Sequence, residues 1–544
     1  MDIRTTGSPA TAEEVAAVDG LLGEPDPVPH HVAFGGRAVR AQRHMLLPVL
    51  HAIQDRAGWV SRGALEYACR RLSIPPAEAY GVASFYARFA LEPQGQTAVH
   101  VCDDIVCRLA GTNLPPGAHA VPCLGLCDRA PAALTERFGE IYEANQTAAQ
   151  GAPNHVGTRL LRRVGVVDPA RIDSYRAHGG FAALRRARQI GPAAAIREVT
   201  EAGLLGRGGA AFPTGRKWQS VADAAVRPHY LVCNGDESEP GTFKDRLLME
   251  NDPFALVEGM AIAAFATGCD KGFVYIRDEY PLARERVAGA IAQAREHGFL
   301  DVDVEVRRGA GAYICGEETA LFNSIEGKRG EPRNKPPFPV QLGLFGKPTL
   351  PNNVETLINV VDILNGDFGD TRLFCLSGHV LRPGVYEVPM GTLLRDLIHM
   401  AGGLRPGRTL QAVLLGGAAG SFVTPDQLDV PLSFDGVRAI GATLGSGAVM
   451  VFDDTANMKD VLLRIARFFR DESCGQCVPC RVGTARQEEI LERMLRASNG
   501  DVSSDVMLLS DIAQAMRDAS ICGLGQTAAN AIASGLKQLP VLNG

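Results

Sequence analysis

The clearest chemistry in this sequence lies in a group of four cysteines near the C-terminus. Cys474, Cys477 and Cys480 have the spacing C-x2-C-x2-C, and Cys522 lies further along the chain. Three closely spaced thiolates and a distant fourth are typical ligands of a 4Fe–4S cluster. Four thiolates can also hold a structural zinc ion, but zinc sites more often use two separate pairs. The spacing therefore favours a 4Fe–4S cluster, with zinc as the alternative.

A second group of four cysteines lies in the N-terminal third of the chain. Cys102 and Cys107 have the spacing C-x4-C, and Cys123 and Cys127 have the spacing C-x3-C. Two such pairs can each hold one iron of a 2Fe–2S cluster. Zinc, or two oxidisable cysteine pairs, are the alternatives. We interpret most of the other cysteines, which are scattered, as small buried hydrophobic residues.

A glycine-rich segment at residues 203–218 is a candidate phosphate site. Backbone N–H groups of a loop with few side chains can surround a phosphate, while Arg207 and Lys217 neutralise its charge. The segment matches neither the dinucleotide fingerprint nor the Walker motif. A surface turn with scattered charge is the alternative. Phe212 either stacks on a ligand ring or packs in the core.

Acidic and amide side chains form further candidate contacts. Residues 233–241 follow a predicted strand, where α/β folds place ligands, and their side chains suit a flavin ring edge and ribose hydroxyls. An exposed acidic turn is the alternative. Residues 309–319 form a second glycine-rich loop with paired carboxylates. Asn352 and Asn353 offer adjacent amides, although Asn353 can instead cap the helix that follows it.

The segment from residue 160 to 370 has to position these groups. Its apolar runs predict strands that alternate with helices, which indicates an α/β domain with a largely parallel sheet. The predicted strands cover residues 230–233, 272–276 and 302–306, and predicted helices cover 256–266 and 283–296.

The flanking segments have different patterns. Helical periodicity starts at residue 42, and a strand is predicted at 97–102. Residues 371–450 are typical of a small α+β domain, and the chain is helical from residue 458. Residues 1–40 show no clear period and are expected to form a loose arm or a partner-binding tail. Residues 145–157 have the composition of a linker.

Composition excludes several classes of function. The net charge of −6 gives no basic field for nucleic acid. No apolar run is long enough for direct membrane insertion, and the first residues do not resemble a secretory signal. We therefore expect a cytoplasmic protein, in which thiols stay reduced and clustered cysteines bind metals.

Several long motifs together resemble one known family. Residues 206–218, 234–246, 309–321, 332–339 and 351–357 look like the NADH-oxidising flavoprotein subunit of respiratory complex I. Residues 42–145, chiefly 80–89 and 123–131, resemble the neighbouring small 2Fe–2S subunit of that enzyme. The chain thus looks like a natural fusion of the two subunits.

The resemblance implies a multidomain α/β and α+β fold. The implied segments are an N-terminal arm at 1–40, a helical plus thioredoxin-like 2Fe–2S domain at 41–148, a Rossmann-like FMN- and NAD(H)-binding domain at 158–370, a ubiquitin-like SLBB domain at 371–452 and a helical bundle with the 4Fe–4S cluster at 455–544. One departure is visible, because only 15 residues separate Cys107 from Cys123. The helix that the family has at this point is expected to be missing, which puts the thioredoxin-like fold in question.

The resemblance also implies sites for non-covalent FMN and for NAD(H). Phe212 and Phe338 match positions that flank the adenine, and Glu239 and Glu318 match positions near the ribose, where their charges would favour NAD over NADP. The implied FMN contacts are Gly206, Arg207, Gly208, Lys217, Asn234, Asp236, Glu237, Gly316, Glu317, Asn352, Asn353 and Thr356.

Within the family, residues 471–477 and 519–526 are most similar to the β subunit of NAD-dependent molybdenum or tungsten formate dehydrogenase. A nicotinamide exchanges two electrons as hydride and a cluster exchanges one, so a flavin must connect them. The implied partner is a catalytic α subunit with a molybdenum or tungsten cofactor and further clusters, whose electrons reduce NAD+. The alternatives are a diaphorase subunit of an NAD-reducing hydrogenase, a fused complex I subunit, a non-catalytic iron–sulfur scaffold and a zinc-stapled structural subunit. No side chain is required as acid or base.

Overall fold

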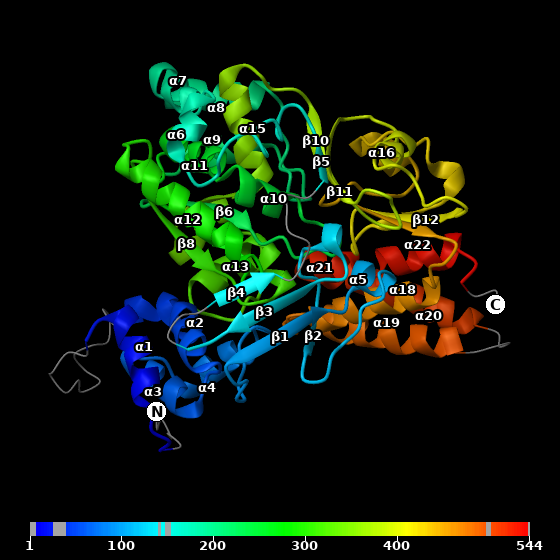
Figure 1. Cartoon of the computed structure of the whole chain (residues 1–544), viewed down its shortest axis with the longest axis horizontal. Coiled ribbons are helices and arrows are strands. Elements are labelled where there is room, and N and C mark those ends of the chain that lie inside the picture. The colour runs from blue at the N-terminus through cyan, green and yellow to red at the C-terminus, as the bar shows by residue number, and fades with distance from the viewer. Residues whose placement is uncertain (1–6, 25–39, 140–142, 147–153, 497–501, 542–544) are drawn as a thin grey trace.

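The computed structural model describes residues 7–24, 40–139, 143–146, 154–496 and 502–541. Their strands form three sheets. In Figure 1 the N-terminal helices (blue) lie at the lower left, and the C-terminal helices (orange and red) lie at the lower right. The N-terminal sheet (light blue and cyan) lies between them, with the parallel sheet and its helices (green) above it.

The parallel-sheet domain contains the predicted α/β segment. Its sheet has the order β8-β7-β6-β9, and all neighbouring strands are parallel. The strands are β6 (Tyr230–Gly235), β7 (Lys271–Ile276), β8 (Asp303–Arg308) and β9 (Thr349–Asn353). The three predicted strands and the parallel arrangement are thus confirmed.

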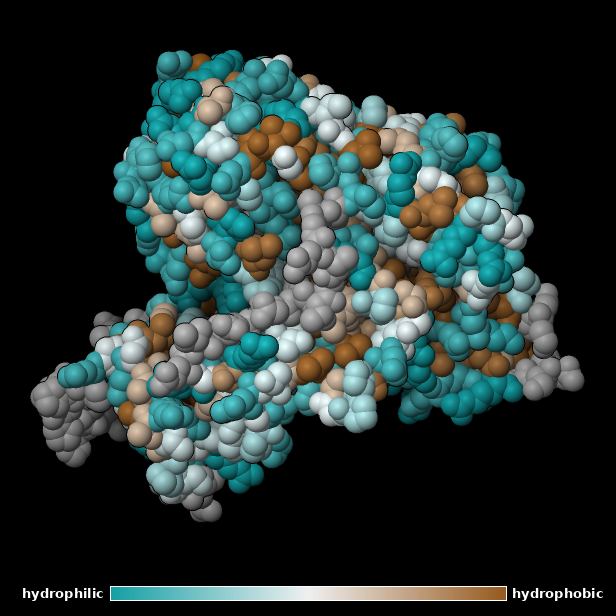
Figure 2. Space-filling view, viewed as in Figure 1, coloured by the Kyte–Doolittle hydropathy of each residue, from teal (hydrophilic) through white to brown (hydrophobic). Residues whose placement is uncertain are grey.

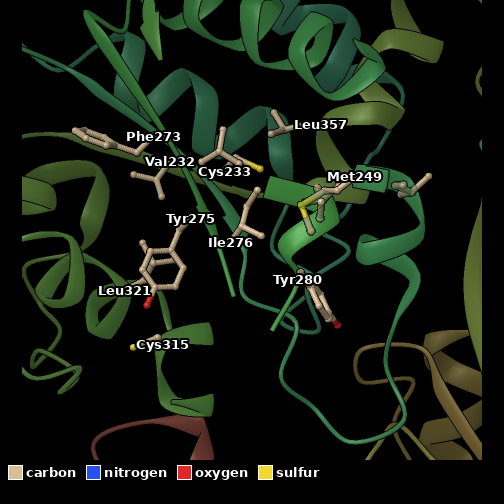
Figure 3. Close-up of a cluster of buried hydrophobic side chains, with 14 of the residues drawn as sticks. Val232, Cys233, Met249, Phe273, Tyr275, Ile276, Tyr280, Cys315, Leu321 and Leu357 are labelled. Atoms are coloured by element: carbon tan, nitrogen blue, oxygen red, sulfur yellow. The ribbon is translucent and has the colours of Figure 1, made fainter. Parts of the chain in front are cut away.

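Helices cover this sheet, because both of its faces are apolar. Figure 3 shows Cys233 of β6 and Ile276 of β7 near Met249 and Leu357, and Tyr275 of β7 beside Leu321 and Cys315. The helices of the domain are α6 (Ile172–Ala177), α7 (Ala182–Ile190), α8 (Pro192–Glu201), α9 (Thr214–Ala222), α10 (Lys244–Asn251), α11 (Pro253–Thr267), α12 (Pro281–Glu296), α13 (Glu318–Ile325), α14 (Pro339–Leu342) and α15 (Val354–Asn365).

The N-terminal sheet domain has the strand order β2-β1-β3-β4, with β1 parallel to β2 and antiparallel to β3. Its elements are β1 (Thr97–Cys102), α5 (Ile105–Leu109), β2 (His119–Val121), β3 (Ala133–Arg137) and β4 (Glu143–Gln146). The five-residue helix α5 carries Cys107 and ends two residues after it. The rest of the connection, residues 110–122, contains β2 and no helix, so the mixed sheet forms without a further helix at this point.

Four helices precede this sheet: α1 (Ala12–Leu22), α2 (Leu46–Ala57), α3 (Arg62–Leu72) and α4 (Pro76–Ala83). The expectation of a loose arm is wrong for α1. Thr11 and Glu14 form a capping box at its start, and Val18 is fully buried. The rest of the predicted arm, at residues 1–6 and 25–39, lies outside the described residues.

Buried charges join these N-terminal helices to the parallel-sheet domain. Arg88, which follows α4, donates from Nε to Asp278 Oδ2 at 3.0 Å. Arg308 bridges Asp278 and Asp55 of α2, the latter at 2.7 Å. Asp278 is fully buried, so the loss of either arginine would leave its charge less compensated, and its contacts help to hold the two parts together.

The third sheet has six strands in the order β13-β12-β14-β10-β11-β5. Its elements are β5 (Asn154–Val156), β10 (Thr371–Gly378), β11 (Gly384–Pro389), α16 (Leu394–Met400), β12 (Leu410–Leu415), β13 (Ser421–Val423), α17 (Phe434–Ala439) and β14 (Ala448–Asp453). The predicted small α+β domain is confirmed. Strand β5 comes from the predicted linker and pairs in parallel with β11, so this part of the linker is ordered.

The C-terminal segment is helical, as predicted. Its helices are α18 (Met458–Asp471), α19 (Val478–Arg496), α20 (Ser503–Ala519), α21 (Gly523–Thr527) and α22 (Asn530–Gln538). Among the described residues, none of the helices combines the length and the apolarity that crossing a bilayer requires. The face shown in Figure 2 is mainly hydrophilic, with small separate hydrophobic patches.

Candidate functional site

The four C-terminal cysteines come together at one end of the C-terminal helices. Cys474 and Cys477 lie in the turn between α18 and α19, and Cys480 lies in the first turn of α19. Cys522 is the N-cap residue of α21; burial raises the pKa of its thiol, and the nearby N–H groups of Leu524 and Gly525 oppose that rise. Backbone N–H groups directed at a ligand sulfur are typical of iron–sulfur sites.

Close packing at Gly525 brings Cys522 to the other three cysteines. A Cβ atom at Gly525 would lie 2.8 Å from Cys480 Cβ, so only glycine allows this approach. Within the described ranges, no three His, Cys, Asp or Glu side chains are arranged around a point where one metal ion would bind. Three thiols within seven residues and a distant fourth fit a 4Fe–4S cluster better than zinc.

The N-terminal four cysteines are all buried in the N-terminal sheet domain. Cys102 ends β1, Cys107 lies in α5, and Cys123 and Cys127 lie in the loop before β3, with their sulfurs 3.4 Å apart. All 13 cysteines of the chain are free, so neither predicted pair is a disulfide. This enclosed set of four thiols suits a 2Fe–2S cluster.

Asp104 connects the two pairs of N-terminal cysteines. Its carboxylate accepts hydrogen bonds from Ile105 N at 2.8 Å and from Cys123 N at 3.2 Å. The same carboxylate lies 3.5 Å from Arg464 Nε of α18. Asp104 therefore holds α5 and the second cysteine loop together and ties both to the C-terminal helices.

The glycine-rich loop lies between α8 and α9 and contacts the start of α15. Arg207 is 2% exposed, and its backbone N–H donates to Thr356 Oγ1 at 2.9 Å. Its side-chain Nε has no hydrogen-bond partner among the described residues. A Cβ at Gly208 would lie 3.3 Å from Asn353 Cβ. A buried cation with an unused donor, beside bare backbone, fits a phosphate.

Two further buried polar atoms lack partners in the described part of the chain: Asn352 Nδ2, and Asp236 Oδ2, which lies 3.5 Å from a Cβ built at Gly316 of the second glycine-rich loop. Burial raises the pKa of Asp236 to about 8. The Asn234 amide donates to the Gly316 carbonyl at 2.9 Å and accepts from Asp236 N at 3.0 Å, which joins the acidic loop to the second glycine-rich loop. Buried polar atoms without partners are costly, so this site is built for a polar ligand. The alternative of an exposed acidic turn is wrong.

Three of the predicted FMN contacts also accept hydrogen bonds from backbone N–H groups at the starts of helices. The Glu237 carboxylate accepts from Asp245 N and Arg246 N, both at 2.9 Å, at the start of α10. Asn353 caps α15, as the capping alternative predicted. Glu317 caps α13. Burial raises the pKa of Glu237 to about 8.

A loop of the third sheet contacts Glu239, one of the predicted NAD(H) contacts. Its carboxylate accepts from Ala419 N at 2.9 Å and from the Tyr313 hydroxyl. Burial raises the pKa of Glu239 to about 7. A Cβ at Gly417 would lie 2.5 Å from Glu239 Cγ, so the loop after β12 packs directly on this side chain.

Lys335 is a site residue that the sequence patterns did not single out. Its Nζ lies 2.8 Å from both Glu317 Oε1 and Glu318 Oε1. Lys335 lies in the matched segment 332–339, which was the available signal. Because the positive charge of Lys335 compensates the negative charge of Glu318, Glu318 repels the extra phosphate of NADP less than its own charge would suggest.

Phe212 and Phe338 are exposed, at 45% and 52%, so Phe212 is not a core residue. Lys217 Nζ lies 5.8 Å from the centre of the Phe212 ring and donates to the Pro351 carbonyl at 3.1 Å. Burial lowers the pKa of Lys217. The exposed Phe212 ring beside a half-buried lysine suits a planar, anionic ligand.

Four family models match the chain. They are the Nuo51 FMN-binding domain at residues 199–362, the NADH-ubiquinone oxidoreductase-F iron–sulfur binding region at 460–541, the thioredoxin-like 2Fe–2S ferredoxin at 36–114 and the SLBB domain at 373–418. The predicted fold classes and the four cofactors, FMN, NAD(H), 2Fe–2S and 4Fe–4S, are thus confirmed.

Relatives with similar sequences agree with these models. The chain is 45% identical over 400 residues to an F-type subunit of the NADH-quinone oxidoreductase of Rhizobium meliloti, and the match spans 70% of this chain and 94% of that protein. It is 42% identical over 398 residues to the NADP-reducing hydrogenase subunit HndC of Solidesulfovibrio fructosivorans, covering 69% and 80% of the two chains.

A solved structure also matches almost the whole chain. The crystal structure of air-oxidised NAD+-reducing NiFe hydrogenase superposes with a TM-score of 0.77 and 33% identity, covering 91% of this chain and 92% of that one. The sequence comparisons and the fold comparison thus point to related redox subunits. The chain therefore belongs to the family of F-type subunits of NADH-quinone oxidoreductase, and it transfers electrons between NAD(H), FMN and iron–sulfur clusters.

Proposed function

We propose that FMN binds between the two glycine-rich loops of the parallel-sheet domain, in contact with the predicted residues. The observation that carries this proposal is the set of buried, unpartnered atoms on Arg207, Asp236 and Asn352. A phosphate would accept from Arg207, and the flavin ring edge would meet Asp236 and Asn352. Flavin supplies the conversion between two-electron and one-electron transfer when it is bound.

We also propose that NAD(H) lies over the flavin, between Phe212 and Phe338, with its ribose near Glu239 and Glu318. Exposed aromatic rings give a nucleotide large contact area without a cost to the core. The acids at this site face Lys335 and Tyr313, which orient them. The residues position and stack the nucleotide, and none has to supply a proton.

The two groups of four cysteines are the proposed cluster ligands, and the four segments 41–148, 158–370, 371–452 and 455–544 are the proposed domains. We further propose a cytoplasmic location, which the 13 free cysteines support.

The proposed partner is a catalytic α subunit with a molybdenum or tungsten cofactor that oxidises formate. The similar relatives are subunits of larger oxidoreductases, which supports a partner of some kind. The formate assignment is supported by the resemblance in residues 471–477 and 519–526. In such a complex, electrons would pass from formate through clusters and FMN to NAD+.

A hydrogen-oxidising partner is the second candidate. The hydrogenase structure covers 91% of this chain, whereas the Rhizobium meliloti relative covers 70%. The hydrogenase therefore matches the N-terminal sheet domain as well as the parallel-sheet domain, which favours it on architecture.

Purification of the chain from its native source distinguishes the two partners. The formate proposal predicts a co-purifying subunit with molybdenum or tungsten and reduction of NAD+ by formate. Nickel in the complex, with reduction of NAD+ by hydrogen, would replace the formate assignment. Absence of FMN from chain loaded with both clusters would refute the proposed flavin site.

A further inference from the structure

The loop 123–127, which carries two of the proposed 2Fe–2S ligands, is held by three buried side chains of the parallel-sheet domain. Arg246 Nε donates to the Gly125 carbonyl at 3.0 Å, and Arg277 Nη2 donates to the Cys123 carbonyl at 2.7 Å. The Tyr280 ring packs on Gly125 so closely that a Cβ there would lie 2.0 Å from the hydroxyl oxygen. The N-terminal sheet domain therefore does not define this loop alone.

Arg277 connects this cluster loop to the proposed flavin loop. Its side chain is 4% exposed, and its Nη1 donates to the Glu237 carbonyl at 2.8 Å. Glu237 follows Asp236, one of the residues with an unpartnered oxygen in the flavin site. The guanidinium of Arg277 thus donates hydrogen bonds to the backbone of both the cluster loop and the flavin loop.

The two arginines differ in how their charges are compensated. Arg246 forms ion pairs with two acids, Asp128 at 2.7 Å and Glu250 at 3.2 Å. Arg277 forms an ion pair with Glu279 at 3.1 Å, and it approaches the ligand loop at Cys123 itself. Of the two, Arg277 is therefore the cation that reaches the backbone of a proposed ligand residue itself.

Charge beside a cluster acts on its reduction. A 2Fe–2S cluster with four thiolates is negatively charged, and one added electron increases that charge. A fixed cation in a buried, weakly screened environment stabilises the reduced state more than the oxidised state. Loss of the cation should therefore lower the reduction potential, and loss of a nearby anion should raise it.

We propose that Arg277 is a positioning residue that fixes the cluster loop against the flavin loop and raises the reduction potential of the 2Fe–2S cluster. The proposal rests on the proposed assignment of Cys102, Cys107, Cys123 and Cys127 as the cluster ligands. It identifies a side chain outside the N-terminal sheet domain as part of the cluster's environment.

The test is a redox titration of the full chain, loaded with both clusters and FMN, followed by electron paramagnetic resonance. Arg277→Gln is expected to lower the ratio of reduced to oxidised 2Fe–2S cluster tenfold at a given potential, about 59 mV for one electron. Glu279→Gln is expected to raise this ratio by a similar factor. Arg277→Lys keeps the charge but cannot make both backbone contacts, so it should lower the ratio less than Arg277→Gln does.

The matched control is Arg295→Gln, which removes an arginine that is 50% exposed on α12 and should leave the ratio unchanged. The 4Fe–4S signal in each sample reports that the variant has folded. If Arg277→Gln does not retain the 2Fe–2S cluster, the ratio of reduced to oxidised cluster in Glu279→Gln tests the proposal instead.

Shifts of the same sign in Arg277→Gln and Glu279→Gln would overturn the proposal, as would a shift in Arg277→Lys equal to that in Arg277→Gln. No shift in Glu279→Gln would also overturn it. Failure of the underlying assignment has a different signature, because the unchanged, iron-loaded chain would then show no 2Fe–2S signal at all.

Discussion

Replacing Gly125 by alanine should remove the 2Fe–2S cluster and leave the 4Fe–4S cluster in place. Gly125 has a φ of +67°, and an added Cβ would lie 2.0 Å from Tyr280 Oη and 2.6 Å from Tyr280 Cε1. Tyr280 is fully buried, and its hydroxyl donates to the Glu237 carbonyl at 3.2 Å, so its ring has no free space to move into.

The size of the effect follows from two contributions. A left-handed backbone conformation costs an alanine about 1–2 kcal/mol. Overpacking a buried site costs about 1–3 kcal/mol more. The sum of about 2–5 kcal/mol corresponds to a factor of at least about 30 against the docked conformation of the loop. Because the loop carries Cys123 and Cys127, the cluster should be lost with it.

The assay is the iron content of the anaerobically purified chain together with the electron paramagnetic resonance signals of the reduced clusters. The control is Gly117→Ala, since Gly117 has a φ of +80° but nothing within 4 Å of an added Cβ. This control carries the conformational cost alone and should keep both clusters. If Gly125→Ala retained as much 2Fe–2S signal as Gly117→Ala, the contact with Tyr280 would not be what defines the loop.

Three other predictions concern the flavin and nucleotide sites. Arg207→Gln should weaken FMN binding about 10- to 100-fold, which is the value of a charge-assisted hydrogen bond. Riboflavin has no phosphate, so its binding should stay unchanged. Equal losses of affinity in fluorescence titrations of the two flavins would contradict a phosphate contact. Phe212→Ala and Phe338→Ala should each raise the KM for NADH about 3- to 10-fold with ferricyanide as acceptor. The Tm should not fall, because both rings are exposed. An unchanged KM would argue against stacking. Burial raises the pKa of Asp236 to about 8, so in flavin-free protein this carboxyl destabilises the fold progressively as the pH rises from about 4 to about 8. The Tm advantage of Asp236→Asn over the unchanged chain should therefore widen between pH 5 and pH 8, and a constant difference would refute the buried assignment.

Local sequence patterns predicted the elements whose residues determine their own conformation. The strands β6 and β7 were predictable because both faces are buried, which requires continuous apolar runs. Helix α1 was missed, although Thr11 and Glu14 have the spacing of a capping box. Strand β5 has three residues and depends on pairing with β11, so its own sequence carries little signal.

The candidate site was predictable at the level of motifs but not of contacts. The cysteine spacing and glycine-rich loops follow from ligand chemistry and are visible along the chain. Contacts such as that between Arg277 and Cys123 join residues that are 154 positions apart, and no local pattern indicates them. Lys335 falls between these cases, because its segment was recognised but its pairing with Glu317 and Glu318 depends on the fold.

The decisive measurement is whether electrons from NADH reach the clusters through the flavin. Fully loaded chain is mixed with NADH, frozen, and examined by electron paramagnetic resonance, with flavin-depleted chain that retains both clusters as the comparison. We expect reduced-cluster signals in the loaded sample and none in the flavin-depleted sample until FMN is added back. Cluster reduction by NADH without flavin, or no reduction in its presence, would contradict the proposed site.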